Sequence, residues 1–405
     1  MHVLFVEPAF PYNQMQFVRA LSAVGARVTG IGEAPAHALP DQLKGWLYGY
    51  EQVRSVVHEP SMLEAVKRVQ AREWVDRMEA TVEAHIMPAA RVREARGIPG
   101  ISVQTSHLCR DKPAMKEALR KAGIPCAASL GSSSVEEIKD FAREIGYPLI
   151  IKPRDAAGAA GTYRVDNDEE LDNALRESQV PNGASVAVEE FIEGHEAFFD
   201  TITINGEIAH HFITHYYPGV LEAMRTRWIS PQFIATNRIG ADSYDEVREM
   251  GKKVIDALNI TTSATHMEWF FGPKGLKFSE IGCRPPGVGA WDLYCNAHEM
   301  DVYKEWAMAI VHSRTSQRAS CGYSAGLINL RPDCDGHIVG YEGLGYVEQL
   351  GDLVTDTHLP PAGSPTQPVE AGYMANAWIR VRHPDYDQLR GILNNIGERV
   401  QVRAR

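Results

Sequence analysis

Residues 266–282 read HMEWFFGPKGLKFSEIG, two segments of alternating apolar and polar side chains around a turn rich in glycine and proline. This alternation is typical of β-strands, and the turn residues predict a hairpin. With a three-residue loop at 273–275, Glu268 stands directly opposite Glu280, on the same face of the sheet. Two carboxylates this close repel each other unless a cation lies between them. The stretch therefore predicts a site for a divalent metal ion such as Mg²⁺.

A slipped register is the alternative, and it would leave one of the two carboxylates in solvent. Just after the hairpin, Arg284 follows Glu280 by four positions and precedes two prolines that draw the chain out of the sheet. A guanidinium there could brace a transferring phosphoryl group through paired hydrogen bonds, or simply neutralise the carboxylates. Gly287 would let a substrate approach the backbone beside Arg284, although an ordinary turn glycine also fits.

Upstream, an apolar strand predicted over 148–152 ends in Lys152, and the loop AAGAAG follows at 156–161. A lysine at the end of a strand is well placed to meet a ligand. Small side chains also let backbone N–H groups approach phosphate oxygens closely. The segment therefore indicates a phosphate-binding loop, with a flexible turn as the alternative.

A third candidate segment is EEFIEGHE at 189–196, where one predicted strand leads into the next. The backbone between Glu189 and Ile192 could present a carbonyl and an N–H group to adenine. The carboxylate of Glu196 could accept hydrogen bonds from both hydroxyls of a ribose. Taken alone, the segment favours an acidic turn in solvent over a nucleotide contact.

The first hundred residues predict a scaffold rather than a site. A strand at 3–6, a helix at 14–24 and a strand at 27–31 form a βαβ unit of the mononucleotide-binding type. No G-x-G-x-x-G follows the first strand, so a dinucleotide site is not supported. Asp111 and Pro113 predict the start of a helix and a domain boundary. Further helices are expected at 114–122, 135–145 and 386–396, and a hairpin of 198–204 with 208–214 around Asn205-Gly206.

Composition narrows the class of protein. The 405 residues are 44% hydrophobic and 23% charged, which is typical of a globular enzyme with several packed layers. The 41 basic residues are dispersed among 52 acidic ones, a net charge of −11, which disfavours nucleic acid as a partner. The sequence contains no run of about 18 apolar residues, so it does not predict a membrane span. Six cysteines without a C-x-x-C pair suggest reduced thiols, and we expect a cytoplasmic protein.

Taken in chain order, Lys152 with its loop, the segment at 189–196 and the hairpin with Arg284 together resemble the ATP-grasp superfamily. The resemblance extends across about residues 100–290. The tail is similar to the C-terminal segment of carboxylate-amine ligases, such as L-amino acid ligases, and of purine-type ATP-grasp enzymes. The resemblance implies an α/β (α+β) fold: a Rossmann-like βαβ domain, a central ATP-grasp unit of two subdomains and a small mixed C-terminal segment. The expected divisions are 1–110 for the N-terminal domain, 111–186 for the small subdomain, 187–312 for the large subdomain with the hairpin, and 313–405 for the tail.

The resemblance also implies a role for each matching residue. It implies nucleotide binding by Lys112, Lys152, Gly158, Gly161, Glu189, Glu190, Ile192 and Glu196. Glu268 and Glu280 are similar to the two metal ligands, and Arg284 to the arginine that stabilises an acyl phosphate, with Lys152 also counted as catalytic. The family's last motif usually reads E-x-N-x-R, but Gly282 replaces the metal-binding asparagine. One ligand must then be water, phosphate or another residue.

The implied activity is that of an ADP-producing ligase that uses ATP with Mg²⁺ or Mn²⁺ and forms an amide or peptide bond. Its expected partners are a small carboxylate and an amine, amino acids among them, in a monomer or homodimer. Substrate contacts are expected at Arg225, Arg227, His266 and Gly287, although loop arginines are commonly inert and His266 also fits simple packing. The alternatives are a carboxylase or formyltransferase of the purine type, or a nucleotide-binding protein without turnover.

Overall fold

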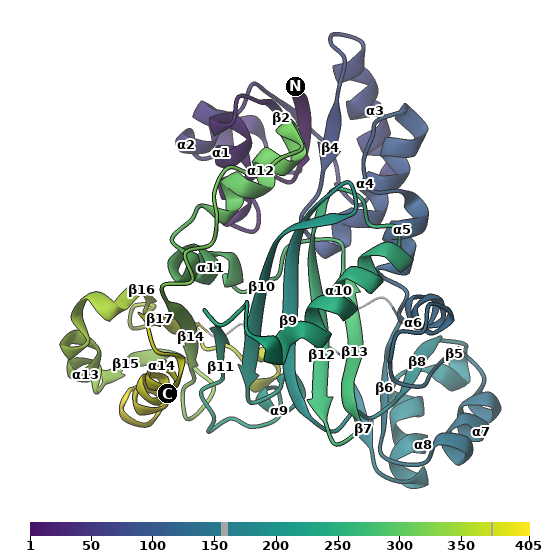
Figure 1. Cartoon of the computed structure of the whole chain (residues 1–405), viewed down its shortest axis with the longest axis vertical. Helices are drawn as coiled ribbons and strands as arrows, with labels where there is room; N and C mark the ends of the chain where they lie inside the picture. The colour runs from purple at the N-terminus through teal and green to yellow at the C-terminus, as the bar shows by residue number, and fades with distance from the viewer. Residues whose placement is uncertain (155–160, 374–375) are drawn as a thin grey trace.

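The computed structural model describes residues 1–154, 161–373 and 376–405 (Figure 1). The apolar run near the N-terminus forms a wholly buried strand at the centre of a four-stranded parallel sheet. In sheet order its strands are β3 (Gly49–Gln52), β2 (Arg27–Gly32), β1 (His2–Val6) and β4 (Arg77–Glu79). Its helices are α1 (Gln14–Ala23), α2 (Asp41–Trp46), α3 (Glu59–Gln70), α4 (Glu83–Arg96) and α5 (Val103–Leu108). The predicted βαβ unit is confirmed.

A smaller sheet follows helix α6 (Lys112–Lys121). Asp111 caps this helix as predicted, since its Oδ1 accepts a hydrogen bond from the N–H of Ala114 at 2.9 Å. In order, the strands are β5 (Ser129–Ser132), β8 (Val186–Glu190), β6 (Leu149–Pro153) and β7 (Tyr163–Val165), with helices α7 (Val135–Ile145) and α8 (Asp168–Glu177). Because β8 pairs with β5 and β6, this sheet continues through Glu190, past the division expected at 186.

The larger sheet is antiparallel and has eight strands. In sheet order they are β13 (Gly275–Gly282), β12 (Ser263–Gly272), β9 (His195–Ile204), β10 (Glu207–Tyr217), β11 (Gln232–Ala235), β14 (Ser324–Leu330), β17 (Ala377–His383) and β16 (Val354–His358). The predicted turn joins β9 to β10, with positive φ of 52° at Asn205 and 87° at Gly206. Strands β14, β17 and β16, which follow residue 312, thus extend the sheet that carries the hairpin. The expected domain divisions stay predictions.

In the hairpin of β12 and β13, Glu268 pairs with Glu280 as predicted, but the loop length and the register of the strands differ from the prediction. Gly272 pairs with Gly275, so the loop has two residues, and the predicted three-residue loop at 273–275 is wrong. The register then shifts beside Glu268, where β13 contains one extra residue. Such a bulge places two residues of one strand against one of its partner. It restores the direct pairing of Glu268 with Glu280, which is confirmed.

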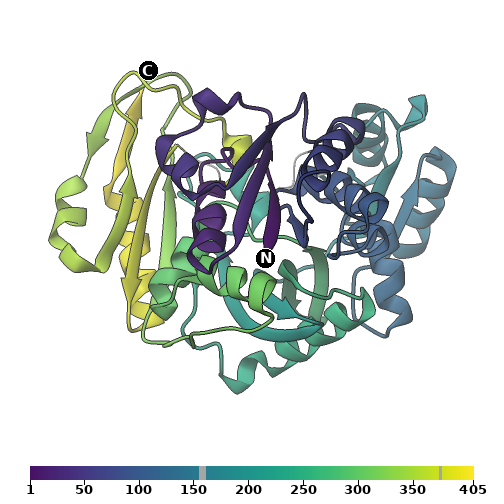
Figure 2. The ribbon, with the colours of Figure 1, turned by 90° about the horizontal axis from the view of Figure 1, so that it is seen from above.

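A shared core joins the N-terminal sheet to the larger sheet. Helices α11 (Ala290–His298) and α12 (Val302–His312) lie between the two, and the ring of Phe17 from α1 packs within about 5 Å of three of their aromatic rings. Seen from above, the first strands lie at the centre of the molecule, with the C-terminal strands on one side (Figure 2). The N-terminal unit is therefore packed against α11 and α12 by apolar burial.

The remaining elements lie around the larger sheet. Helix α10 covers one of its faces (Figure 1), and a two-stranded sheet of β15 with β18 stands near the C-terminus. These elements are α9 (Val220–Ala223), α10 (Asp245–Ala257), β15 (Ile338–Glu342), α13 (Leu344–Gln349), α14 (Tyr386–Arg399) and β18 (Gln401–Ala404). Short 3₁₀ turns occur at Ala36–Ala38, Val180–Asn182, Asp242–Tyr244, Gly351–Leu353 and Val369–Ala371. Among the described residues, no helix combines the length and apolar character needed to cross a membrane.

Candidate functional site

Two lysines from the smaller sheet unit meet a carboxylate of the hairpin. The Nζ atoms of Lys112 and Lys152 lie 3.4 Å and 3.9 Å from Oε2 of Glu280. The two units are held together by a backbone hydrogen bond of 2.8 Å from the N–H of Phe278 to the carbonyl of Pro125. Burial opposes ionisation of Glu280, but Lys112 and Lys152 outweigh it and keep the pKa of Glu280 below its usual range. The fold thus brings together three predicted residues, Lys112, Lys152 and Glu280, that lie far apart in the sequence.

Behind these groups lies a buried ion network that the sequence did not reveal. Oε1 of Glu189 lies 2.5 Å from Nζ of Lys116, and Oε2 lies 2.8 Å from Nζ of Lys152. Burial disfavours the charged carboxylate, yet the two lysines lower the pKa of Glu189 to about 2. Burial lowers the pKa of Lys116 to about 8, against the pull of Glu189. Lys116 could have been found from its spacing, since it lies one helical turn after Lys112 on the same face of α6.

The position of Glu189 changes how the predicted adenine-binding segment is understood. Its side chain holds two lysines, and its backbone lies in β8 between β5 and β6. The N–H of Glu190 donates to the carbonyl of Ala128 at 2.9 Å, and the Glu190 carboxylate pairs with Lys274. Of the residues predicted here, Ile192 lies beyond the strand, so the candidate contact with a base moves toward the end of the segment.

Three carboxylates lie on one face of the larger sheet. Glu268 pairs across the strands with Phe198, and Glu196 lies two residues before Phe198, so period-two alternation puts both on the face that carries Glu280. Oε2 of Glu196 accepts a hydrogen bond of 2.7 Å from the N–H of Val220. Burial and the nearby charge of Glu268 raise the pKa of Glu196 to about 8. Negative charge is therefore incompletely balanced on this face.

These residues fit a hard divalent cation. Carboxylate oxygens are the ligands that Mg²⁺ and Mn²⁺ prefer, and a cation between Glu268 and Glu280 would relieve their repulsion. Within residues 1–154, 161–373 and 376–405, no group of three or more His, Cys, Asp or Glu side chains is arranged to hold a metal ion. The remaining coordination positions would therefore be filled by water or by phosphate oxygens.

His266 pairs across the strands with Gly282, the glycine at the position where the motif E-x-N-x-R has its asparagine. Its Nδ1 lies 2.7 Å from Oδ1 of buried Asp200, and its Nε2 lies 3.5 Å from Oε1 of Glu268. Burial opposes the charged imidazolium, but Asp200 outweighs it and raises the pKa of His266 to about 9. This raised pKa favours the charged form of the ring, which lies between Asp200 and Glu268.

Arg284 lies against the N-terminal domain. Its Nε donates to Oε2 of Glu83 at 2.8 Å, and its Nη1 donates to the carbonyl of Pro285 at 2.9 Å. Nη1 of Arg110 donates to the backbone carbonyl of Glu83 at 2.8 Å. Glu83 stands 201 positions before Arg284 in the chain, so no local pattern could have indicated the pair. The beginning of α4 therefore orients the predicted catalytic arginine.

Each of the other predicted residues that the structure describes is exposed or pairs with a group outside this cluster of charges. Arg227 forms an ion pair of 2.8 Å with Asp335, and Arg225 is exposed. Gly287 is exposed, with open space where a side chain would project. Gly161 has a φ of 68°, which favours glycine, whereas Gly158 lies outside the described residues. Substrate contacts at these positions stay predictions.

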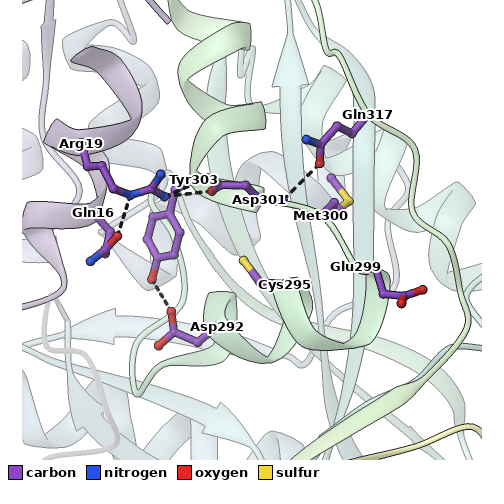
Figure 3. Close-up of a pocket in the computed structure, with 9 residues that line it drawn as sticks. All are labelled: Gln16, Arg19, Asp292, Cys295, Glu299, Met300, Asp301, Tyr303 and Gln317. Atoms are coloured by element: carbon purple, nitrogen blue, oxygen red, sulfur yellow. Dashed lines mark hydrogen bonds and ion pairs between the residues drawn. The ribbon is translucent and has the colours of Figure 1, made fainter. Parts of the chain in front are cut away.

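A separate cavity of about 470 Å³ lies between α1 and the pair α11 and α12 (Figure 3). Nη2 of Arg19 reaches across it to Asp301 at 2.9 Å, and the hydroxyl of Tyr303 donates to Asp292 at 3.0 Å. None of the residues lining it was a predicted site residue. The cavity therefore lies apart from the cluster of lysines and carboxylates.

Known proteins resemble this chain in sequence. Residues 117–299 match the family model described as an ATP-grasp domain. An L-arginine-specific L-amino acid ligase of Bacillus subtilis is 32% identical over 221 residues, which cover 53% of this chain and 52% of that protein. An alanine-anticapsin ligase of Bacillus subtilis (strain 168) is 26% identical over 303 residues, covering 66% and 62%. The matched region thus spans between half and two thirds of these relatives' length.

Solved structures resemble it along the whole chain. An L-amino acid ligase from Bacillus licheniformis has a TM-score of 0.80 at 17% identity, covering 100% of this chain and 98% of that one. An N5-carboxyaminoimidazole ribonucleotide synthetase from Thermotoga maritima has a TM-score of 0.71 at 18% identity, covering 100% and 99%. At such low identities the likeness shows the fold alone. Residues 117–299 are thus similar to an ATP-grasp domain, and the fold of the whole chain is shared with these ligases and synthetases.

Proposed function

We propose that this chain is an ATP-dependent carboxylate-amine ligase. A substrate carboxylate oxygen attacks the γ-phosphorus of ATP, and the bond from that phosphorus to ADP breaks. The nitrogen of an amine then attacks the acyl carbon, phosphate leaves, and the nitrogen loses a proton to give an amide. The observation that carries the proposal is the convergence of Lys112, Lys152 and Glu280, with Glu268 opposite Glu280.

Each residue near this convergence has a proposed task. Lys112 and Lys152 contact the phosphates of ATP, with Gly161 in the loop above them. Arg284 holds the acyl phosphate through paired hydrogen bonds, a task that suits a planar guanidinium. A Mg²⁺ or Mn²⁺ ion held by Glu268 and Glu280 would neutralise negative charge on the phosphates.

The nucleoside end of ATP is proposed to lie along the start of β9. The buried carboxylate of Glu196 accepts hydrogen bonds from the ribose hydroxyls, and Glu190 with Ile192 borders the base. Glu196 suits this task because burial already holds it in one place, with Val220 N–H on one oxygen. The relatives named as amino acid ligases support amino acids as the carboxylate and the amine.

The proposal is tested by mass spectrometry of products after incubation with Mg-ATP and pooled amino acids. We expect ADP and phosphate in equal amounts, together with a dipeptide whose formation requires both amino acids. With the amine omitted, hydroxylamine should trap the activated carboxylate as a hydroxamate. ADP release that depends on bicarbonate or formate, and is indifferent to amino acids, would contradict the amide-ligase proposal.

That last result would favour the second candidate, an enzyme of the purine-biosynthesis type that activates bicarbonate or formate. It is motivated by the shared fold with an N5-carboxyaminoimidazole ribonucleotide synthetase. A third candidate binds nucleotide without turnover and is motivated by Gly282 in place of the family's asparagine. Calorimetric binding of Mg-ATP without any trapped hydroxamate across a broad carboxylate panel would favour the third.

Glu83 is expected to act as a positioning residue for Arg284. Replacing Glu83 by alanine removes the carboxylate that holds Nε of Arg284, so kcat should fall about ten- to a hundredfold. The KM for ATP should change little, because Glu83 lies outside the lysine cluster. Glu83→Gln keeps a hydrogen-bond acceptor and should recover part of kcat. Glu59→Ala is the control, since Glu59 also pairs with an arginine of α4, Arg91, at 2.6 Å. Equal kcat in Glu83→Ala and Glu59→Ala would contradict this role.

A further inference from the structure

A second cavity, of about 370 Å³, opens on the opposite face of the larger sheet from the carboxylates. His215 of β10 lines it and pairs across the strands with Ala197 of β9. Since side chains alternate along a strand, His195 points to the same face as Ala197, whereas Glu196 points to the other. A ligand in this cavity would therefore leave the proposed nucleotide site free.

The floor of the cavity is a chain of hydrogen-bonding rings. Nε2 of His195 lies 2.9 Å from Nδ1 of buried His215, and Nε2 of His215 lies 2.7 Å from the hydroxyl of Tyr244. Burial, followed by the charge of His195 and of Arg390, lowers the pKa of His215 to about 3, so this ring is neutral. Each hydrogen bond between neighbouring groups uses one proton, so the neutral chain keeps one donor for an anion, at His195 or at Tyr244.

Two arginines stand at the rim of the cavity. Arg238 pairs with Asp387 at 2.8 Å, so its charge is balanced. Arg390 of α14 lies over the ring of Tyr217 at 4.1 Å, and no carboxylate of the described residues forms an ion pair with it. A guanidinium stacked on an aromatic ring is held in a fixed plane, with its N–H groups available along the edge. The lining of the cavity therefore carries one positive charge without an ion-pair partner among the described residues, beside a chain of hydrogen-bonded rings.

We propose that this cavity is a binding site for a small anion, a carboxylate or a phosphate, held by the guanidinium of Arg390. Planar bidentate recognition of such anions is what a stacked arginine does best. Tyr217 fixes the guanidinium plane, and the hydrogen-bonded rings of His195 and His215 line the space below it. The site is independent of the proposed ligase activity. Because His195 directly precedes Glu196 in β9, a bound anion contacts the strand that carries Glu196 on its other face.

The test is calorimetric titration of the full-length protein with inorganic phosphate and, separately, with benzoate. We expect saturable binding of at least one, weakened about tenfold or more in Arg390→Gln, since a charge-assisted bidentate contact is lost. Binding of phosphate alone or of benzoate alone identifies which class of anion the site takes. Titration of ¹⁵N-histidine-labelled protein should shift the ring signals of His195 and His215.

Arg399→Gln is the matched control. Arg399 also belongs to α14, is exposed and lies over a tyrosine ring, that of Tyr346 at 4.7 Å, but does not line the cavity. This variant should bind both anions as the unchanged protein does. His195→Gln is a second probe, expected to weaken binding with Arg390 intact. The proposal is overturned if neither anion binds saturably, or if Arg390→Gln binds as tightly as Arg399→Gln, which would place the anion elsewhere, for instance at the lysine cluster.

Discussion

Replacing Glu280 by alanine is expected to abolish ADP formation, with kcat lowered by about a thousandfold or more. Glu280 is the carboxylate nearest to both Lys112 and Lys152, at 3.4 Å and 3.9 Å, and it stands opposite Glu268. Its loss removes one of the two candidate metal ligands. It also removes a carboxylate that lies near the positive charges of both lysines. The measurement is steady-state ADP release with Mg-ATP and pooled amino acids.

The fold should survive this change, because Glu280 lies at the surface of the site, with about a quarter of its side chain exposed. Glu207→Ala is the matched control: Glu207 is also a strand carboxylate near a lysine, Lys252 at 3.4 Å, but its side chain is 80% exposed. We expect full activity and an unchanged circular dichroism spectrum in the control. Activity of Glu280→Ala within about threefold of the control would contradict the metal assignment.

Replacing Glu189 by glutamine is expected to cause the largest loss of stability. Its carboxylate is the shared anion for Lys116 and Lys152, all three groups being largely removed from solvent. Removing one partner of a buried ion pair leaves uncompensated charge and costs about 3–5 kcal/mol. Urea unfolding followed by fluorescence should show this loss at pH 7. Asp172→Asn, which breaks the half-exposed pair with Lys139, should cost at most about 1 kcal/mol.

The same network predicts how stability depends on acid. The pKa of Glu189 is lowered from 4.5 to about 2 by its lysines, against the effect of burial. Its contribution to stability is therefore fully present above pH 4.5 and is lost as the pH falls toward 2. Between these values, unfolding midpoints of the unchanged protein should drop more steeply than those of Glu189→Gln. Parallel pH profiles for the two proteins would show that Glu189 does not stabilise through its charge.

Local patterns predicted most elements, because each depends on neighbours in the chain. The Asn205-Gly206 turn and the Asp111 cap were confirmed, since turn and cap geometry is decided within a few residues. The loop of the hairpin of β12 and β13 was predicted one residue too long, and a bulge restored the pairing of Glu268 with Glu280. The shorter loop and the one-residue bulge offset each other in the register. The alternation of apolar and polar residues could not reveal either of them, because it indicates only the face on which a side chain lies.

Residues that act across the chain were not predictable in the same way. The backbone near Glu189 was expected beside a base, which stays a prediction, while the ion pairs of its side chain with Lys116 and Lys152 were not foreseen. Arg284 was expected to stabilise an acyl phosphate, which stays a prediction, while its hydrogen bond to Glu83 of the first domain was not foreseen. Burial decides such pairs, since a charge removed from water must find a partner wherever the fold provides one.

Residue periodicity and turn chemistry were sufficient to predict the strands, the hairpins, the order of the three motifs and the face on which Glu268 and Glu280 lie. Which charges meet became known from the folded chain: Lys112 and Lys152 with Glu280, Glu189 with Lys116, and Arg284 with Glu83. The folded chain also shows that Arg390 stands over Tyr217 without a carboxylate partner among the described residues. Electrostatic pairing depends on the distance between charges in space and on their burial, and the spacing of residues along the chain predicts neither.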